Sequence, residues 1–341
     1  METDGIPQIL WNNNYPSSIS LCRPIKMIFE KENAQLTNRV VAEINAEIKK
    51  LVPTKIGNVY ISAQMHFTMV DTKVINDLTE TISQECYICK RSGKKLNLPG
   101  ETPDSDDPEK YKFGMSPLHA YIRTMEMFVK ISYRLSMKTP TWRVYKERET
   151  VKSREETIRL ALKEQLGLRI SEPRPGGGNS NSGNVARRFF LERKIVAKIT
   201  GLNENLLERF YVILTLINSK SEINVTGFEM YAENTRVLFN ELYGWYALPP
   251  TVHKLLVHGA AMIKYSVLPL GMFSEEAGES RNKSIRKFRE CHARKFNREV
   301  NLEDVFNRLL VTSDPLISLT NKASSRLSEV PLPDNVTHLL L

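Results

Sequence analysis

Cys86-Tyr87-Ile88-Cys89 and His253-Lys254-Leu255-Leu256-Val257-His258 are the two stretches that decide how this chain folds. The first is a C-x-x-C, in which one tight turn can present two thiolates to a tetrahedral zinc ion. The second is an H-x4-H, a spacing that can place two imidazoles on one side of a helix or its end. The two pairs lie more than 160 residues apart. Together, Cys86, Cys89, His253 and His258 predict a zinc site that closes a large insertion.

Two other interpretations of these residues stay open. A C-x-x-C also arises by chance or serves redox chemistry, and histidines are ordinary polar residues of helices. Redox chemistry is disfavoured because no thioredoxin-like βαβ pattern surrounds Cys86. The remaining cysteines, Cys22 and Cys291, have no neighbour at ligand spacing. Because there are only four cysteines and no apolar run near Met1 that could serve as a signal sequence, a disulfide scaffold is not expected.

Composition and charge limit the class of protein. The chain has 341 residues, 41% of them hydrophobic, which favours two or three domains with buried cores. Its 48 basic and 39 acidic residues give a net charge of +9, which suggests a polyanionic partner. No apolar run reaches the roughly 20 residues that cross a bilayer. We therefore expect a soluble, intracellular protein with no membrane partner and no small-molecule substrate.

Hydrophobic periodicity predicts an early α/β segment followed by a mostly helical chain. Alternating apolar residues predict a strand at Cys22–Glu30, and β-branched and aromatic residues predict another at Val59–Val70. Three- and four-residue steps predict a helix over Ala34–Val52 between them. The same steps predict further helices at Leu118–Leu135, Arg154–Leu166, Ala186–Ile199, Glu204–Leu216, Thr251–Tyr265, Glu276–Phe296 and Leu302–Leu310.

Three segments have loop composition. Residues Leu96–Lys112 and Pro173–Asn184 are rich in Pro, Gly and polar residues, and the chain from Ser324 onward resembles a loose tail. Arg187 and Arg188 follow the second loop. A glycine-rich loop that enters a helix can offer backbone amides to a phosphate, so contact with the DNA backbone is predicted there. A plain connector stays an open alternative.

Two carboxylates have the positions that two-metal phosphodiester chemistry requires. Such acids lie at strand ends and on a facing helix. Asp71 follows the strand predicted at Val59–Val70, and Glu279 lies on a predicted helix. Eight basic residues and two acids lie between Glu279 and Arg298. This helix is either an ordinary solvated surface or a metal ligand beside a phosphate-binding face.

Four motifs in order resemble the Transib transposases and the related catalytic subunit of the V(D)J recombinase. The zinc histidines are followed by Ser274-Glu275-Glu276-Ala277-Gly278-Glu279-Ser280-Arg281-Asn282-Lys283, which is similar to that family's catalytic helix. The zinc cysteines, Pro117-Leu118-His119-Ala120 and Ser182-Gly183-Asn184-Val185-Ala186-Arg187-Arg188 resemble further family motifs. The resemblance covers roughly residues 20 to 320.

The resemblance implies an α/β fold, in which an incomplete RNase H-like core is split by a large, mostly α-helical zinc-binding insertion. It divides the chain into partial core strands at residues 1–80, the insertion at 81–258, a catalytic helix at 259–298 and a C-terminal helix and tail at 299–341. Zn2+ would be structural.

The resemblance also implies function. Asp71 and Glu279 would bind catalytic Mg2+ or Mn2+. Water would nick one strand, and the freed 3′ hydroxyl would attack the other to leave a hairpin. The partners would be double-stranded transposon ends and a second copy of the chain, in the nucleus. The residues implied in holding DNA are His119, Asn184, Arg187, Arg188, Asn282, Lys283, Arg286 and Arg289.

One family feature has no counterpart in this sequence. The family's first catalytic aspartate precedes the segment that resembles Ile25–Glu30, and Asp4 is a false match for it. The expectation is therefore a truncated enzyme that cleaves DNA weakly or not at all alone. The alternative is a domesticated, catalytically dead protein that binds zinc and DNA. A helical protein-interaction scaffold is a third hypothesis.

Overall fold

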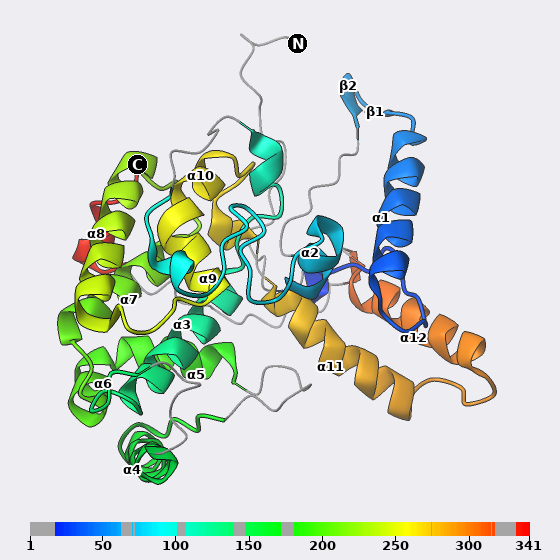
Figure 1. The fold of residues 1–341 in the computed structure, drawn as a ribbon. Helices are drawn as coiled ribbons and strands as arrows, with labels where there is room; N and C mark the ends of the chain where they lie inside the picture. The colour runs from blue at the N-terminus through cyan, green and yellow to red at the C-terminus, as the bar shows by residue number, and fades with distance from the viewer. Residues whose placement is uncertain are drawn as a thin grey trace. The chain divides into compact units, whose positions relative to one another are not determined.

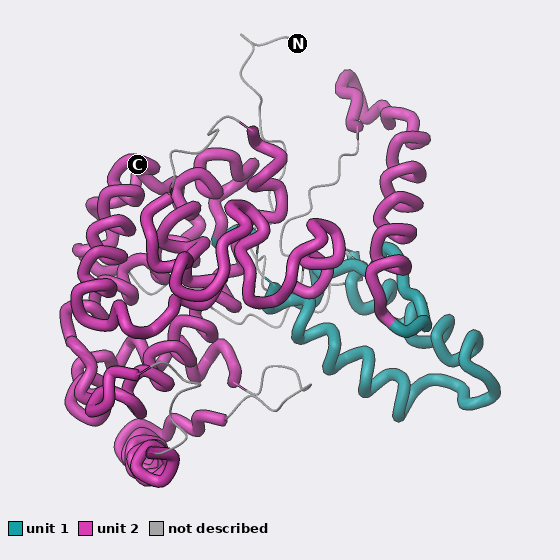
Figure 2. The backbone as a smooth tube through the Cα atoms, viewed as in Figure 1, with its two compact units in different colours: residues 1–31, 271–331 teal, residues 32–270, 332–341 magenta. Residues whose placement is uncertain are grey.

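The structure is a computed structural model that is mostly helical, and it describes residues 18–62, 70, 72–100, 107–139, 147–171, 181–273, 275–314, 316–317 and 332–341. Two compact units make up the chain (Figure 2). The small unit comprises residues 1–31 and 271–331, and the large unit comprises residues 32–270 and 332–341. Among the described residues, no helix is both long and apolar enough to span a membrane.

The large unit contains most of the helices and a single two-stranded hairpin within its described residues (Figure 1). In chain order its elements are α1 (Ala34–Lys49), β1 (Thr54–Ile56), β2 (Val59–Ile61), α2 (Thr72–Thr79), η2 (Gly93–Asn97), η3 (Pro108–Tyr111), α3 (Pro117–Ser132), α4 (Arg148–Leu166), α5 (Gly183–Leu191), α6 (Arg193–Thr200), α7 (Glu204–Asn218), α8 (Val225–Tyr243), α9 (Pro250–His253), the π-helical η5 (Lys254–His258), α10 (Gly259–Lys264) and α14 (Asp334–Thr337).

Helix α7 organises the core of the large unit. It packs against α3, α5, α6, α8 and α14, and its apolar residues are buried around most of its circumference, as expected of a helix that is apolar on nearly every side. The ring of Phe128 on α3 meets those of Phe210 and Phe190 edge to face, with centroids 5.1 and 6.3 Å apart. Asn203 caps α7 by accepting a hydrogen bond from the Leu206 amide. The predicted helix at Glu204–Leu216 is thus confirmed.

Asn97, at the end of η2, joins three segments of the large unit. Its side chain donates to the Tyr246 carbonyl and accepts from the Leu248 amide, both at 2.8 Å. Its own carbonyl accepts from Arg236 at 2.7 Å and from Asn240 at 2.8 Å. The first two residues of the loop predicted at Leu96–Lys112, Leu96 and Asn97, are both buried, so the start of this loop is fixed onto α8 and onto the chain before α9.

The C-terminal residues are part of the large unit, and for residues 332–341 the predicted loose tail is wrong. Val336 and Leu339 are buried. The Leu339 carbonyl accepts from the Asn224 amide, and the Leu341 amide donates to the Glu222 carbonyl. Val336 and Leu339 pack against α7 and α8. The sequence does not predict this packing, because two apolar residues among Ser, Pro and Asp form no periodic pattern.

The small unit contains η1 (Ile19–Leu21), α11 (Glu276–Cys291) and α12 (Arg298–Thr312), and η6 (Leu270–Met272) lies where the chain enters it. Its core consists of Ala293, Val305 and Leu309, with Met27, Ile285 and Phe288 packed around them. These three buried apolar residues make a small core, so directional polar contacts contribute more to fixing the positions of the helices.

The strand predicted at Cys22–Glu30 is wrong. The segment has no β-structure, and the side chains of Ile25 and Phe29 are 80% and 61% exposed. A strand needs a hydrogen-bonded neighbour, and none of the described strands pairs with it. Of the strand predicted at Val59–Val70, β2 forms the start and pairs antiparallel with β1, and residues 63–69 lie outside the described part of the chain.

Each predicted helix has a counterpart in the structure, but the bounds differ at several places. The helix predicted at Glu276–Phe296 ends at Cys291, and the one predicted at Thr251–Tyr265 contains the π-helical η5. Helix α2 lies where no helix is predicted. The helix predicted at Ala186–Ile199 is two helices, α5 and α6, which meet at Glu192. Helix α8 was not predicted, because Thr235 and Arg236 are buried on it and interrupt its apolar stripe. Buried Arg236 is paired with Glu233 and with the Asn97 carbonyl, which makes its burial tolerable.

Replacing Asn97 tests its role in the large unit. We expect Asn97→Ala to lower the free energy of unfolding by about 2–4 kcal/mol, because the Tyr246 carbonyl and the Leu248 amide lose their partners inside the protein. Denaturant unfolding measures this change. Asn234→Ala, at an exposed position of α8, is the control and should stay within about 0.5 kcal/mol of wild type. Equal stability of the two variants would contradict this role.

Candidate metal centre

The four predicted zinc ligands come together in the large unit. One ligand atom each from Cys86, Cys89, His253 and His258 lie within 4.8 Å of one another. Cys86, His253 and His258 are buried, and Cys89 is partly exposed. The prediction that these motifs meet across more than 160 residues of sequence is therefore confirmed, and the cluster can hold a structural metal ion such as zinc.

A tight turn presents the two cysteines. The Cys86 amide donates to the Arg91 carbonyl at 2.9 Å, and the Lys90 amide donates to the Cys86 carbonyl at 2.7 Å. Lys90 adopts a left-handed conformation with φ of 55°, which reverses the chain directly after Cys89. An antiparallel bridge between Glu85 and Ser92 closes the turn. The C-x-x-C spacing thus brings both sulfur atoms to one side of the loop.

A π-helical turn presents the two histidines. In an α-helix, residues five apart lie about 140° apart around the axis and point in different directions. The helix widens to π geometry at η5, in which residues five apart lie on the same side of the axis. The imidazole centroids of His253 and His258 are consequently 5.1 Å apart. In this chain the π-helical turn thus brings the two imidazoles of the H-x4-H motif together.

The contacts of His253 set its tautomer. Its Nδ1 lies 2.6 Å from the Leu96 carbonyl oxygen, which only accepts, so Nδ1 carries the proton. Its Nε2 lies 3.2 Å from Sγ of Cys89 and keeps its lone pair for a metal. Sequence reasoning missed Leu96 as an orienting residue, since a backbone carbonyl leaves no signal in the residue type.

The site fits a zinc ion. The Nε2 atom of His258 is buried and has no hydrogen-bond partner, which is costly unless a ligand satisfies it. Tetrahedral zinc with bonds of about 2.0–2.3 Å places its ligand atoms about 3.3–3.8 Å apart. The ligand atoms lie within 4.8 Å of one another, which is about 1 Å wider than the upper end of this range. A small contraction around the ion would complete the geometry.

The protonation states suit metal binding. A hydrogen bond with Cys86, supplemented by both imidazoles, lowers the pKa of Cys89 to about 2, and the same bond raises the pKa of Cys86. Burial lowers the pKa of His258 and favours its neutral form. The cluster thus already offers a thiolate at Cys89 and a neutral imidazole at His258, and metal binding would displace the Cys86 proton.

Of the two predicted catalytic carboxylates, the structure describes only one. Asp71 lies outside the described residues. Glu279 lies in the first turn of α11 in the small unit and is exposed. Four predicted DNA-binding residues share this helix and are also exposed, and they are Asn282, Lys283, Arg286 and Arg289.

The other predicted DNA-binding residues lie on two helices of the large unit. His119 is in the first turn of α3 and Asn184 in the first turn of α5, whereas Arg187 is at the middle of α5 and Arg188 is in its last turn. The two helices start side by side, because a Cβ added to Gly183 would lie 2.3 Å from a methyl group of Leu118. Further along, rings of α3 and α5 remain in contact, so the helices run in the same direction. Their N-termini therefore point the same way.

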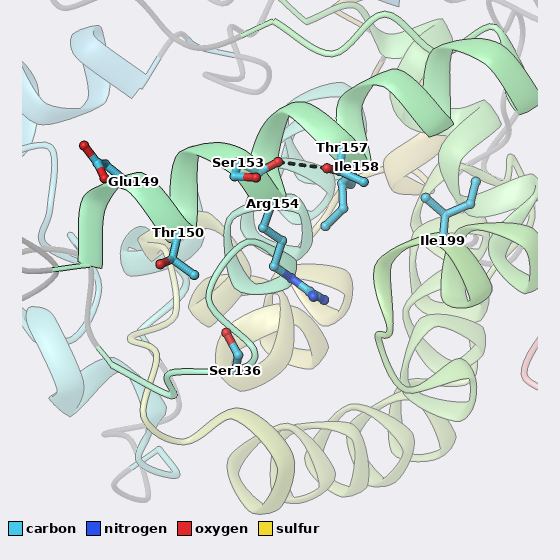
Figure 3. Close-up of a pocket in the computed structure, with 8 residues that line it drawn as sticks. All are labelled: Ser136, Glu149, Thr150, Ser153, Arg154, Thr157, Ile158 and Ile199. Atoms are coloured by element: carbon cyan, nitrogen blue, oxygen red, sulfur yellow. Dashed lines mark hydrogen bonds between the residues drawn. The ribbon is translucent and has the colours of Figure 1, made fainter.

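A separate open groove of about 670 Å³ lies beside α4 (Figure 3). Hydroxyl groups of Ser136, Thr150, Ser153 and Thr157 line it, and Thr157 donates to the Ser153 carbonyl. The Arg154 guanidinium donates to the carbonyls of Ser132 and Thr200 at 2.6 and 3.0 Å. Arg154 thereby caps the ends of α3 and α6, and its role is structural.

The chemistry of the four-ligand cluster is that of a structural metal site. All four ligand positions are supplied by the protein, which leaves no open position for a substrate, whereas catalytic zinc keeps one. A scan against models of known protein families finds no match to this chain, and a search of curated proteins finds no similar sequence. The residues themselves are therefore the basis on which a function is proposed.

Metal content tests the cluster. We expect one zinc per purified wild-type chain and almost none in Cys86→Ser or His258→Ala, because three ligands of this set hold the ion far more weakly. The free energy of unfolding should fall by at least about 3 kcal/mol in both. Elemental analysis and denaturant unfolding measure these changes.

Matched controls are available for both zinc variants. Cys291→Ser and His292→Ala replace the same residue types at exposed positions of the small unit and should retain zinc and stability. A folded wild-type protein without zinc after expression in zinc-supplemented medium would exclude the metal site.

Proposed function

We propose that this chain is a zinc-stabilised, DNA-binding part of a cut-and-paste DNA transposase core of the DDE type, similar to the Transib transposases. The observation that carries the proposal is the meeting of Cys86 and Cys89 with His253 and His258. A site shared across so much sequence is improbable for a chance C-x-x-C or for ordinary helix histidines. It is the arrangement that the resemblance implies.

The distribution of positive charge supports DNA binding. On α11, Lys283, Arg286, Lys287 and Arg289 are exposed, and Glu290 is their only acidic neighbour within the second half of the helix. Arg286 lies 3.9 Å from Glu290, but both side chains are largely exposed, so this pair is weak and leaves Arg286 accessible. Such a face suits the phosphates of duplex DNA.

The paired helix ends of the large unit support phosphate contact as well. The N-terminus of a helix carries partial positive charge and free amides, and α3 and α5 begin side by side. Arg187 lies over the Tyr121 ring, 5.4 Å from its centroid, which holds the guanidinium near this end of α5. Asn184 is exposed in the first turn of α5, and Arg188 is exposed in its last turn.

The proposal includes an RNase H-like core and its chemistry. The β1–β2 hairpin, the strand predicted to continue from it and α11 would belong to that core, and the helical region bearing the cluster would be inserted into it. Asp71 and Glu279 would hold Mg2+ or Mn2+, which stabilise the attacking and leaving oxygens of a phosphodiester. A homodimer acting in the nucleus is part of the same proposal.

Salt dependence of DNA binding tests the basic face of α11. We expect wild-type protein to bind a fluorescent duplex with an affinity that falls as salt rises, because bound phosphates release counterions. Arg286→Gln should reduce the log–log slope by about one. Arg308→Gln removes an exposed cation of α12 and should leave the slope unchanged. Binding that is absent or insensitive to salt would instead favour a protein-interaction scaffold.

Metal-dependent nicking tests the carboxylate. With Mn2+ and supercoiled plasmid, we expect weak nicking by the wild-type protein and its loss in Glu279→Gln, since one metal loses a ligand. DNA affinity should be retained. Glu303→Gln, an exposed acid on α12, is the control. If wild type binds DNA but Glu279→Gln changes no nicking, the chain is better described as a catalytically dead zinc- and DNA-binding protein.

A further inference from the structure

Arg281 differs from every other cation of α11. Arg281 is only 6% exposed, whereas the other cations of the helix are exposed, namely Lys283, Arg286, Lys287 and Arg289. A guanidinium always carries its charge, so burying it is unfavourable unless its donors are satisfied. The sequence pattern of a basic helix does not distinguish this arginine from its neighbours.

Three directional hydrogen bonds hold the Arg281 guanidinium within the small unit. Its Nε donates to the Cys22 carbonyl at 3.1 Å and its Nη2 to the Ile19 carbonyl at 2.7 Å. Its Nη1 donates to the Thr312 hydroxyl at 2.8 Å. One planar group therefore joins α11 to η1 and to the last turn of α12.

The bond with Thr312 has a defined direction. The Thr312 hydroxyl donates to the Arg308 carbonyl at 2.8 Å, so it can accept from Arg281. At the other end of α11, Ile285 and Phe288 rest on the small cluster of Ala293, Val305 and Leu309. Apolar contact of this size holds a helix in place but fixes its rotation poorly. The guanidinium supplies the missing directional constraint.

The rotation of α11 decides which residues reach solvent. At about 100° per residue, Glu279 and Lys283 each lie about 200° around the helix from Arg281, and Arg286 lies about 140° from it. All three are exposed, while Ala277, Arg281 and the apolar residues that follow face inward. Fixing Arg281 therefore directs the carboxylate and the cations outward together.

We propose that Arg281 is a positioning residue, which sets the rotation of α11 so that Glu279, Lys283 and Arg286 face the DNA. This inference rests on the proposed function. Arg281 itself touches neither DNA nor metal, because its donors are committed to Ile19, Cys22 and Thr312. An effect of its replacement on DNA binding must therefore act through other residues.

The experiment compares Arg281→Met and Arg281→Lys with two charge-matched variants. Arg289→Gln removes an exposed cation of the proposed DNA face, and Arg308→Gln removes one outside it. Each protein is titrated with salt on the same fluorescent duplex. The rate of Cys22 alkylation is measured in parallel, with exposed Cys291 as an internal standard.

For Arg281→Met we expect faster alkylation of Cys22, about a tenfold loss of DNA affinity and a salt slope reduced by one to two, because several phosphate contacts are misdirected. Arg281→Lys keeps the charge without the planar fork and should lie between it and wild type. Arg289→Gln should reduce the slope by about one and leave Cys22 unchanged. Arg308→Gln should change neither measurement.

Two results overturn the inference in different ways. If Cys22 is released in Arg281→Met or in Arg281→Lys while DNA affinity and slope match those of wild type, Arg281 only stabilises the small unit. If wild type and Arg308→Gln show no salt-dependent binding, the proposed function fails and the positioning role falls with it. Should Arg281→Met fail to fold, Arg281→Lys decides, since its smaller change leaves a cation to pair with the same acceptors.

Discussion

The meeting of a cysteine turn with a histidine-bearing helix is the constraint on which the large unit depends. Closing a loop this long is entropically costly, although the cost grows only slowly with loop length. The metal cluster is not the only feature that offsets this entropic cost. The Leu96 carbonyl orients His253, and the next residue, Asn97, is bonded to α8 and to the chain before α9. The carbonyl that orients a metal ligand and the side chain that anchors the loop therefore belong to adjacent residues of η2, Leu96 and Asn97.

In the small unit, a buried arginine rather than a metal cluster fixes how the elements are oriented. The buried apolar core of this unit is too small to specify how α11 is rotated, and the chain places one arginine inward among several that point outward. The same residue type thus serves as an internal anchor at position 281 and as a surface cation at positions 286 and 289. Charge counting treats them alike, and only burial and hydrogen bonding separate them.

Helices with long apolar periodicity and metal ligands with a typical spacing can be predicted from the sequence. Features that depend on contacts between distant residues cannot. The helices at Ala34, Glu204 and Glu276 begin where their periodicity begins. Helix α8 escaped prediction because Arg236 is buried through partners distant in sequence. The ligand set was predictable from residue types and spacing, whereas the Leu96 carbonyl and the inward Arg281 were not, because their roles depend on partners that local sequence does not identify.

The histidine spacing shows how metal site and core share one distortion. With four residues between them, His253 and His258 would diverge in an α-helix, and the π-helical turn that reunites them shifts every later residue around the axis. Gly259 follows immediately and lies against the Phe228 ring, where a Cβ would be 2.8 Å from a ring carbon. The widened turn is therefore fixed on one side by the need to converge on the cysteines and on the other by close packing against α8. A side chain at position 259 would disturb both the packing against α8 and the position of the histidines. The same turn carries both features, so it cannot move to relieve one without moving the other.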